Sequence, residues 1–179
     1  VGRNSKNPRG VCGVNIAGRP MKLSDIPILP TKIIVDTYEK VTVPEVYIRL
    51  VEAGKTTDKV YPLPFGDYWI RARDGGLVSV ERKHNDLAAD WPFHLHYQFQ
   101  KALDSGVKKV VLLAEGLLPT LYTNGKLLAG NKERGIYYDQ VWSTLLRWQT
   151  EKGILIYPCH EGSAHIARAL LSIQRYFRR

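Results

Sequence analysis

The sequence predicts a single α/β domain with a central mixed β-sheet flanked by helices. Short runs of β-branched residues alternate with longer segments in which apolar residues recur every three or four positions. The length of 179 residues and a hydrophobic share of 44% suit one domain with a well-filled core. Residues 1–31 lack this periodicity and are rich in Gly, Pro, Asn and Arg, so we expect a basic N-terminal arm there and the domain over 32–179.

The net charge of +9 favours a polyanionic partner, without separating DNA, RNA and a membrane surface. The arm could follow a phosphate backbone or remain a solvated tail, and its residues leave both readings open. No apolar run reaches the length that spans a bilayer, and the N-terminus has no apolar signal core. We therefore expect an intracellular protein, in the cytoplasm or the nucleus, with no membrane partner. The two cysteines have no C-x-x-C spacing, which argues against a structural zinc site.

The first half of the domain is expected to hold three strands and one helix. The strands are predicted by β-branched or alternating runs over 32–36, 60–71 and 77–83. A turn with two glycines over 74–76 joins the last two strands. The helix is expected to begin at Thr42, because Thr42 and Glu45 form a capping-box pattern and Pro44 suits the first turn. Its inward residues and C-terminal cap are predicted to be Val46, Leu50, Val51 and Gly54.

The second half is expected to hold three helices and two further strands. Helices are predicted over 87–104, over 138–152 with Gly153 as its cap, and from a cap at Ser163 onwards. Their inward residues are expected to be Trp91, Leu95, Phe99 and Leu103, then Val141, Leu145 and Trp148, then Ile166, Leu170, Ile173 and Phe177. The strands are predicted over 107–115 and 154–157. Residues 116–136 are expected to be irregular, with a hairpin turn at 124–125.

Charged side chains gather on the predicted strand 77–83 and beside it. Because side chains alternate along a strand, Glu81 and Lys83 point to one face and Arg82 to the other. Asp67 lies at the start of the preceding strand, and pairing of the two strands would bring it close to Glu81. Asp36 ends the first strand, at the kind of sheet edge where sites gather in α/β folds.

This set of side chains suits hydrolysis of a phosphodiester bond. Two carboxylates can hold a divalent cation through hard oxygen ligands, and a bound cation activates water and polarises a phosphate. A neighbouring lysine can orient that water or neutralise developing charge. The alternative interpretation is an exposed strand with a surface ion pair, because Glu-Arg-Lys sequences are common on protein surfaces.

The order of these motifs resembles the nuclease domain of the XPF family of structure-specific endonucleases, within the PD-(D/E)-x-K nuclease superfamily. The resemblance covers residues 32–175 and rests on residues 33–36, 65–68, 80–83, 97–98, 112–115 and 154–158. It implies a restriction-endonuclease-like fold. It also implies metal-dependent hydrolysis of branched DNA (flaps, forks or junctions), as used in DNA repair and recombination, with Mg²⁺ or Mn²⁺ and no small-molecule cofactor.

The resemblance implies a role for each residue of the cluster. Asp67 and Glu81 would bind the metal, helped by the backbone carbonyl of Arg82. Lys83 would act on the water or on the scissile phosphate. The side chain of Arg82 would brace the site by pairing with a carboxylate on its own side of the sheet.

Supporting residues and departures from the family pattern also follow from the resemblance. Asp36 and Glu39 correspond to acids that follow the family's first strand and support the site. The family usually has an arginine two residues after the first aspartate, where this chain has Tyr38. It usually has an aspartate four residues after the lysine, where this chain has Leu87. Asp86 lies one residue earlier and could still reach the site from the start of a helix.

Two helix surfaces are further candidates for contact with a substrate. Gln98 shares a predicted helix face with His94 and Lys101, and this face could look into the active site or into solvent. His94 and His96 diverge on a helix, which argues against a histidine metal site. The last helix carries the DNA-binding candidates Arg168, Arg175 and Arg178. Cationic residues near a helix C-terminus also complement the helix dipole, so the sequence leaves both interpretations open.

Three other functions compete with an endonuclease for branched DNA. A stand-alone Holliday-junction resolvase would use the same chemistry, and a homodimer would suit it, because two cuts on a symmetric junction need two sites. The second alternative is a non-catalytic DNA-binding or scaffolding domain, against which the intact Asp67, Glu81 and Lys83 argue. The third is a basic RNA-binding domain.

Overall fold

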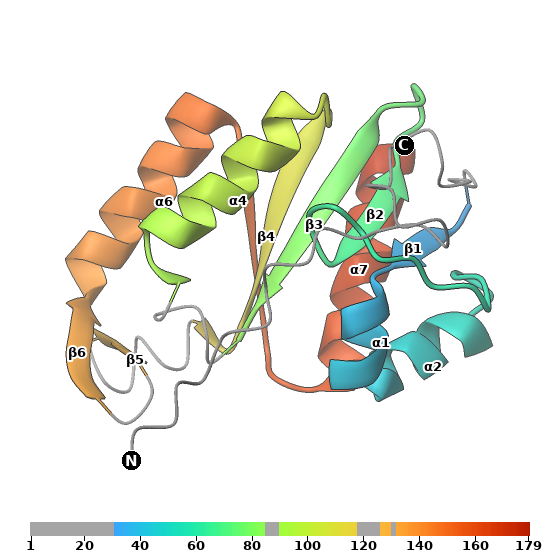
Figure 1. Cartoon of the computed structure of the whole chain (residues 1–179), viewed down its shortest axis with the longest axis horizontal. Coiled ribbons are helices and arrows are strands. Elements are labelled where there is room, and N and C mark those ends of the chain that lie inside the picture. Colours follow the sequence, from blue (N-terminus) through green and yellow to red (C-terminus); the bar gives the residue numbers. More distant parts are fainter. Residues whose placement is uncertain (1–30, 85–89, 118–125, 130–131) are drawn as a thin grey trace, which may run out of the picture.

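Five strands form the central sheet of the computed structural model, which describes residues 31–84, 90–117, 126–129 and 132–179 (Figure 1). Their order in the sheet is β1 (Ile33–Val35), β2 (Tyr68–Arg71), β3 (Leu77–Lys83), β4 (Lys109–Glu115) and β7 (Leu155–Cys159). β1, β2 and β3 pair antiparallel, whereas β3, β4 and β7 pair parallel. The sheet is therefore mixed, and the predicted α/β fold is confirmed.

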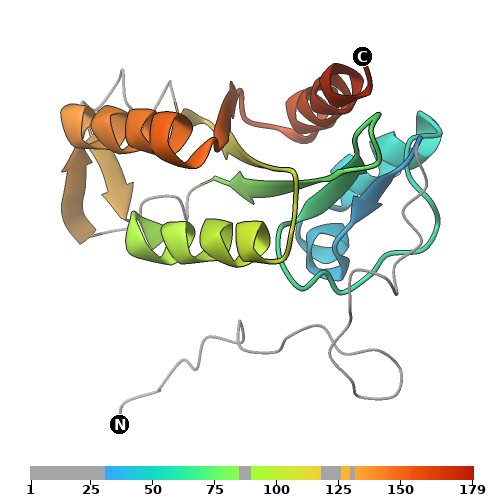
Figure 2. The same ribbon diagram turned by 90° about the horizontal axis from the view of Figure 1, so that it is seen from above.

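Helices cover both faces of the sheet. α4 (Phe93–Asp104) and α6 (Tyr138–Lys152) pack on one face, and α1 (Thr37–Thr42), α2 (Pro44–Glu52) and α7 (Ser163–Arg178) lie on the other. In Figure 1 the first pair lies to the left of β3 and β4, and the second group lies to the right. Figure 2 shows β3 and β4 running between α4 and α7. Both faces of β3 are thus covered.

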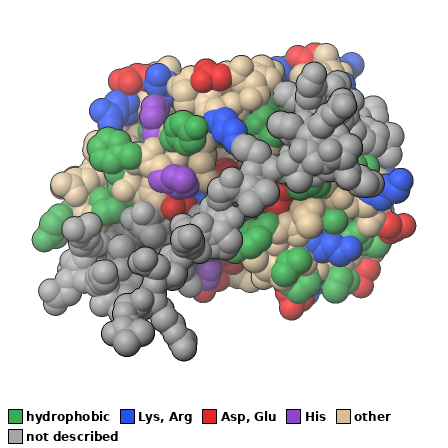
Figure 3. All heavy atoms as spheres, viewed as in Figure 1, with side chains coloured by type: hydrophobic (Ala, Val, Ile, Leu, Met, Phe, Trp, Pro, Cys, Tyr) green, Lys and Arg blue, Asp and Glu red, His purple; other side chains and the backbone are tan. Residues whose placement is uncertain are grey.

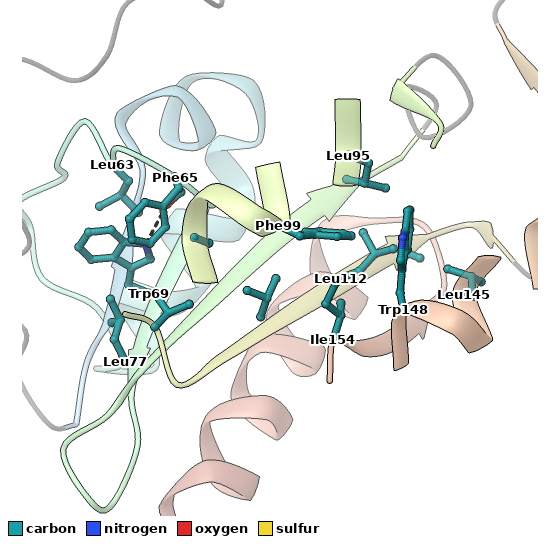
Figure 4. Packing of buried hydrophobic residues seen from close by; sticks show 14 of the residues in the cluster. Leu63, Phe65, Trp69, Leu77, Leu95, Phe99, Leu112, Leu145, Trp148 and Ile154 are labelled. Atoms are coloured by element: carbon teal, nitrogen blue, oxygen red, sulfur yellow. Dashed lines mark hydrogen bonds between the residues drawn. The ribbon is translucent and has the colours of Figure 1, made fainter. Parts of the chain in front are cut away.

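Two apolar clusters fix the position of β3. On the α4 side, Trp148 and Phe99 are in contact with ring centroids 5.2 Å apart, and Trp69 of β2 belongs to the same cluster (Figure 4). On the α7 side, the alternate residues Val78 and Val80 of β3 are buried. Full burial of a large apolar side chain contributes about 1.5–3 kcal/mol. Packing on both faces therefore holds the last residues of β3 in place.

A tight hairpin joins β2 to β3. Its connection, residues 72–76, contains the predicted turn residues 74–76, and Gly75 adopts a φ of 86°, in the left-handed region that favours glycine. The register pairs Tyr68 with Val80. Asp67, the residue before β2, therefore lies beside the last residues of β3.

Several predicted elements have the expected bounds. β3 and α6 cover the predicted ranges, and α6 buries Val141, Leu145 and Trp148. Gly153 closes α6 with a φ of 64°. The predicted bounds of β1 and β7 differ from those observed by one or two residues at each end, and β4 begins two residues later than predicted and ends as predicted. Within the helix expected over 87–104, α4 begins at Phe93, and residues 85–89 lie outside the described ranges.

The predicted helix is present as α2, with Pro44 in its first turn as expected, but the predicted capping role of Thr42 is wrong. Thr42 is the last residue of the separate short helix α1, and its hydroxyl donates to the carbonyl of Tyr38 at 3.1 Å. α2 begins at Pro44, after Val43, which makes no side-chain cap bond. The capping-box pattern fails because the preceding residues are already helical. Val51, predicted to point inward, is 36% exposed.

Two further predictions are wrong in part. Of the strand expected over 60–71, β2 joins the sheet and Tyr61 forms an isolated bridge with Asp36, whereas Leu63 and Phe65 between them bury their side chains outside any strand. Apolar burial in this segment comes from a loop, which the residue pattern does not distinguish from a strand. Ser163 is the first residue of α7 rather than its cap, because Gly162 occupies the N-cap position.

The segment predicted to be irregular contains a second, two-stranded sheet. β5 (Lys126–Ala129) and β6 (Lys132–Tyr137) pair antiparallel. The turn expected at 124–125 lies outside the described residues. The part of 116–136 that forms this hairpin is therefore regular, contrary to the prediction.

The predicted arm over 1–31 lies outside the described residues, apart from Thr31. The carbonyl of Thr31 accepts a hydrogen bond from the Gln174 side chain of α7 at 3.0 Å. The boundary between arm and domain stays a prediction. Among the described helices, none combines the length and the apolar character needed to cross a membrane.

Candidate active site

The start of β2 and the end of β3 bring together the three side chains at the centre of the sequence prediction. Lys83 Nζ lies 2.9 Å from Glu81 Oε1, and both side chains are buried on the α4 side of β3. Asp67 accepts the backbone N–H of Arg82 through Oδ2 at 2.6 Å. The charges of Glu81 and Lys83 both act on the Asp67 carboxyl. The structure thus places two carboxylates and one ammonium group side by side.

A glycine permits the close approach of the two strands. Gly66 has a φ of 67°, and a Cβ there would collide with the hydroxyl of Ser79 and lie 3.2 Å from the Val80 carbonyl. The next residue, Asp67, then joins β3, because its N–H donates to the Val80 carbonyl at 2.8 Å. Gly followed by Asp at these positions is therefore what brings the carboxylate to the end of β3.

Burial makes the ionised acids of this cluster costly. Burial, and then the charges of Glu81 and Glu39, raise the pKa of Asp67 well above its ordinary value. Burial also raises the pKa of Glu81, although the neighbouring Lys83 opposes that rise. Lys83 is buried as well, with only 3% of its side chain exposed. A single ammonium group therefore balances two buried acids incompletely, and a further cation would stabilise their ionised forms.

The stability of the metal-free protein is expected to fall as the pH rises above about 4. Because the folded-state pKa of Asp67 is raised above its ordinary 3.8, its contribution to stability is complete below that value. It is lost as the pH rises through the raised pKa, and Glu81 acts in the same direction. The measurement is the thermal unfolding midpoint of chelator-treated protein against pH. The fall should be smaller in Asp67→Asn, and equal pH profiles of the two proteins would contradict the prediction.

The oxygen atoms of this cluster are suited to a hard divalent cation. Asp67 and Glu81 supply carboxylate oxygens. A backbone carbonyl can add a third oxygen, because the N–H and the C=O of any one residue in a strand point toward the same edge of that strand. The Arg82 N–H points to Asp67, so its carbonyl is directed to the same edge. Across the ranges that the structure describes, no three or more His, Cys, Asp or Glu side chains form a group that could hold a metal. A cation here would thus have two side-chain ligands, with the backbone and water completing its shell.

A buried ionic network lies on the opposite face of β3. Arg82 Nε lies 2.9 Å from Glu39 Oε2, and Arg82 Nη1 lies 2.7 Å from Glu115 Oε2. The Tyr68 hydroxyl donates to Glu39 at 2.7 Å, and Glu115 accepts the backbone N–H of Gly162 at 2.9 Å. Burial opposes the charge on Arg82, but its carboxylate partners raise its pKa overall. The network ties α1, β4 and the start of α7 to the strand that carries Glu81.

The sequence analysis missed two acids of this region. Asp90 Oδ2 lies 2.8 Å from Lys83 Nζ, so Lys83 is held between Asp90 and Glu81. The sequence signal that could have identified Asp90 is its position just before Trp91 and Pro92, which lead into α4. Glu115 belongs to a motif of the family resemblance, but its pairing with Arg82 depends on the parallel register of β3 and β4. The predicted supporting residue Asp86 lies outside the described residues.

Asp36 has a clear structural task. Its Oδ2 accepts the backbone N–H of Tyr38 at 2.6 Å as the N-cap of α1, and its Oδ1 accepts the N–H of Leu63 at 2.7 Å. Both oxygens therefore have backbone partners, which fix the start of α1 and the loop that leads to β2. The structure shows no hydrogen bond or ion pair from the Asp36 carboxylate to Asp67, Glu81 or Lys83 within its described residues.

The other predicted surfaces lie on different sides of the sheet. Lys101 of α4 donates to the Pro64 carbonyl at 2.8 Å, so this face of α4 looks toward the segment before Asp67. Gln98, one turn earlier, has a buried Oε1 without a hydrogen-bond partner among the described residues. The arginines of α7 are exposed, but α7 covers the face of the sheet opposite the cluster; they are Arg168, Arg175 and Arg178.

Comparison with known proteins bears on the fold. No protein-family model matches the chain, and no curated protein matches it. The solved structure of XPF from Aeropyrum pernix matches 81% of this chain with a TM-score of 0.57 and 22% sequence identity. The chain has an XPF-like nuclease fold. The restriction-endonuclease-like architecture implied by the motifs is confirmed.

The match covers 64% of the length of the XPF structure. At this level of identity, the similarity shows the XPF-like fold and not the activity. Within that fold, the cluster of Asp67, Glu81 and Lys83 lies at the open end of the β2–β3 hairpin, away from its turn. Its chemistry has to be argued from the site itself.

Proposed function

We propose that this chain is a metal-dependent, structure-specific DNA endonuclease that hydrolyses phosphodiester bonds in branched DNA. The observation that carries the proposal is the buried cluster of Asp67, Glu81 and Lys83 within an XPF-like fold. The net charge of +9 suits a polyanionic substrate. The preference for flaps, forks or junctions rests on the resemblance to the XPF family.

In this proposal Asp67, Glu81 and the Arg82 carbonyl hold Mg²⁺ or Mn²⁺. The cation, when bound, lowers the pKa of a water ligand and polarises the phosphate. Lys83, held by Glu81 and Asp90, would donate to the attacking water or to a phosphate oxygen. Glu39 and Glu115 act through Arg82 and keep β3 in register with its neighbours. Gln98 is proposed to orient water or substrate from α4, because its side-chain amide oxygen, Oε1, is buried without a hydrogen-bond partner in the described structure.

A homodimer is part of the proposal for symmetric substrates, because paired cuts need two active sites. Nicks placed symmetrically on a four-way junction, with flaps left intact, would identify the chain as a stand-alone resolvase. Binding without any cutting would identify a scaffolding domain. Stronger binding to RNA than to branched DNA at equal salt would identify an RNA-binding domain.

Glu81→Gln is expected to abolish cutting of a panel of labelled flaps, forks and four-way junctions in Mg²⁺. The loss should be about a thousandfold, or about 4 kcal/mol of transition-state stabilisation, because one of two carboxylate ligands is removed. Glu52→Gln is the matched control, since Glu52 is exposed at the end of α2. Wild-type product no greater than that of Glu81→Gln would refute a nuclease.

A further inference from the structure

Two large aromatic side chains lie on the outer surface of α4. Phe93 is 83% exposed and Tyr97 is 66% exposed, whereas Leu95 and Phe99 of the same helix are buried in the core. Residues four apart lie on the same helix face, so the two exposed rings are neighbours. Two adjacent exposed rings contribute nothing to the core and form a surface suited to binding.

This pair lies close to the candidate active site. Asp90, whose carboxylate lies 2.8 Å from Lys83 Nζ, precedes Phe93 by three residues. Three residues of chain span at most about 11 Å. The Cα–Cβ bonds of a helix tilt toward its N-terminus, so Phe93 and Tyr97 lean toward the N-terminal end of α4, which Asp90 precedes in the chain. The rings are therefore within reach of a strand whose phosphate occupies the site.

The residues of α4 around the two rings include no acid. The sequence from Trp91 to Leu103 contains no Asp or Glu, but contains His94, His96 and Lys101. Figure 3 shows histidine, hydrophobic and basic side chains on this face of the molecule over the region of α4, with acidic side chains among and beside them. Exposed rings on a helix face with no acid of its own between Trp91 and Leu103 suit stacking of bases along a phosphate backbone.

We propose that Phe93 and Tyr97 form a stacking platform for unpaired bases of the DNA strand next to the cleaved bond. This inference rests on the proposed function and adds the part of the substrate that α4 recognises. Stacking tolerates any base sequence, because each base offers a flat π face. The platform thus selects single-stranded character rather than sequence, which is what a nuclease for flaps or forks requires.

The test compares Phe93→Ala/Tyr97→Ala with Tyr176→Ala, a change of another exposed ring, on α7 at the opposite face of the sheet. The probes are a fork with 2-aminopurine in its unpaired arm and a duplex of equal length, both in Ca²⁺. Binding to the wild type should quench the 2-aminopurine fluorescence. The double variant should lose the quenching and bind the fork about 10- to 100-fold more weakly, with duplex affinity changed less than about twofold. Tyr176→Ala should behave as the wild type.

Unchanged quenching, or an equal loss of affinity for fork and duplex, would overturn the platform. Sedimentation velocity tests whether a second copy of the chain, rather than DNA, covers the rings. A wild type that is a dimer and a double variant that is a monomer would show that it does. Failure of the proposed function has a different signature. A wild type that binds and quenches the fork but never cuts it would remove the nuclease and retain the platform.

Discussion

Asp67→Asn is expected to abolish Mg²⁺-dependent cleavage and, in the same protein without metal, to raise the thermal unfolding midpoint. The two effects have one cause, since burial and the charge of Glu81 make ionised Asp67 unfavourable in the absence of a cation. Asparagine keeps the shape and can still accept the Arg82 N–H, but removes the charge. Cleavage should fall about a thousandfold. The midpoint should rise by about 3–6 °C at neutral pH, if removal of the charge is worth about 1–2 kcal/mol.

Metal titration of the same variant separates ligand loss from misfolding. Mg²⁺ should raise the unfolding midpoint of the wild type by mass action, and should leave Asp67→Asn unchanged. Asp58→Asn is the matched control, because Asp58 is exposed and lies outside the cluster. A lower midpoint in metal-free Asp67→Asn, or an undiminished response to Mg²⁺, would contradict Asp67 as a ligand.

Residue periodicity predicts the elements that carry an apolar stripe. The 15 residues of α6 include Val141, Leu145 and Trp148 on one face, which is enough to define a helix and its direction of burial. α1 has six residues, and its one buried residue is Glu39. A helix without an apolar face leaves no periodic signal, so the pattern assigned its last residue, Thr42, to the next helix.

For the candidate site, too, the sequence predicts the contacts that depend on local structure and misses those that depend on the tertiary fold. Alternation along β3 predicts that Glu81 and Lys83 share a face, and the Gly-Asp pair before β2 predicts the approach of Asp67; these are local signals. Asp90 and Glu115 reach the site through the turn into α4 and through the parallel pairing of β4, which are not local. The family resemblance pointed to Asp86, which lies outside the described residues, and the sequence did not identify Asp90 as a partner of Lys83.

Lys83→Met is expected to reduce cleavage about 100- to 1,000-fold while changing DNA affinity less than about threefold. Lys83 is buried between Glu81 and Asp90 and is not part of the exposed surface, so in the proposed function its charge would act at the reacting phosphate and contribute little to DNA affinity. Loss of the ammonium leaves both carboxylates without their cation, which should also cost about 3 kcal/mol of folding stability. A defect in cleavage could then be mistaken for unfolding.

The double variant Lys83→Met/Asp90→Asn resolves that ambiguity. Removing the charge of Asp90 takes away one of the acids that Lys83 neutralises, so part of the lost stability should return. Cleavage should stay as low as in Lys83→Met, because no ammonium group is restored. Asp90→Asn alone keeps Lys83 paired with Glu81 and should retain most of the activity. If the double variant recovered cleavage together with stability, Lys83 would be a structural residue, and the chemistry would rest on the two carboxylates and their metal.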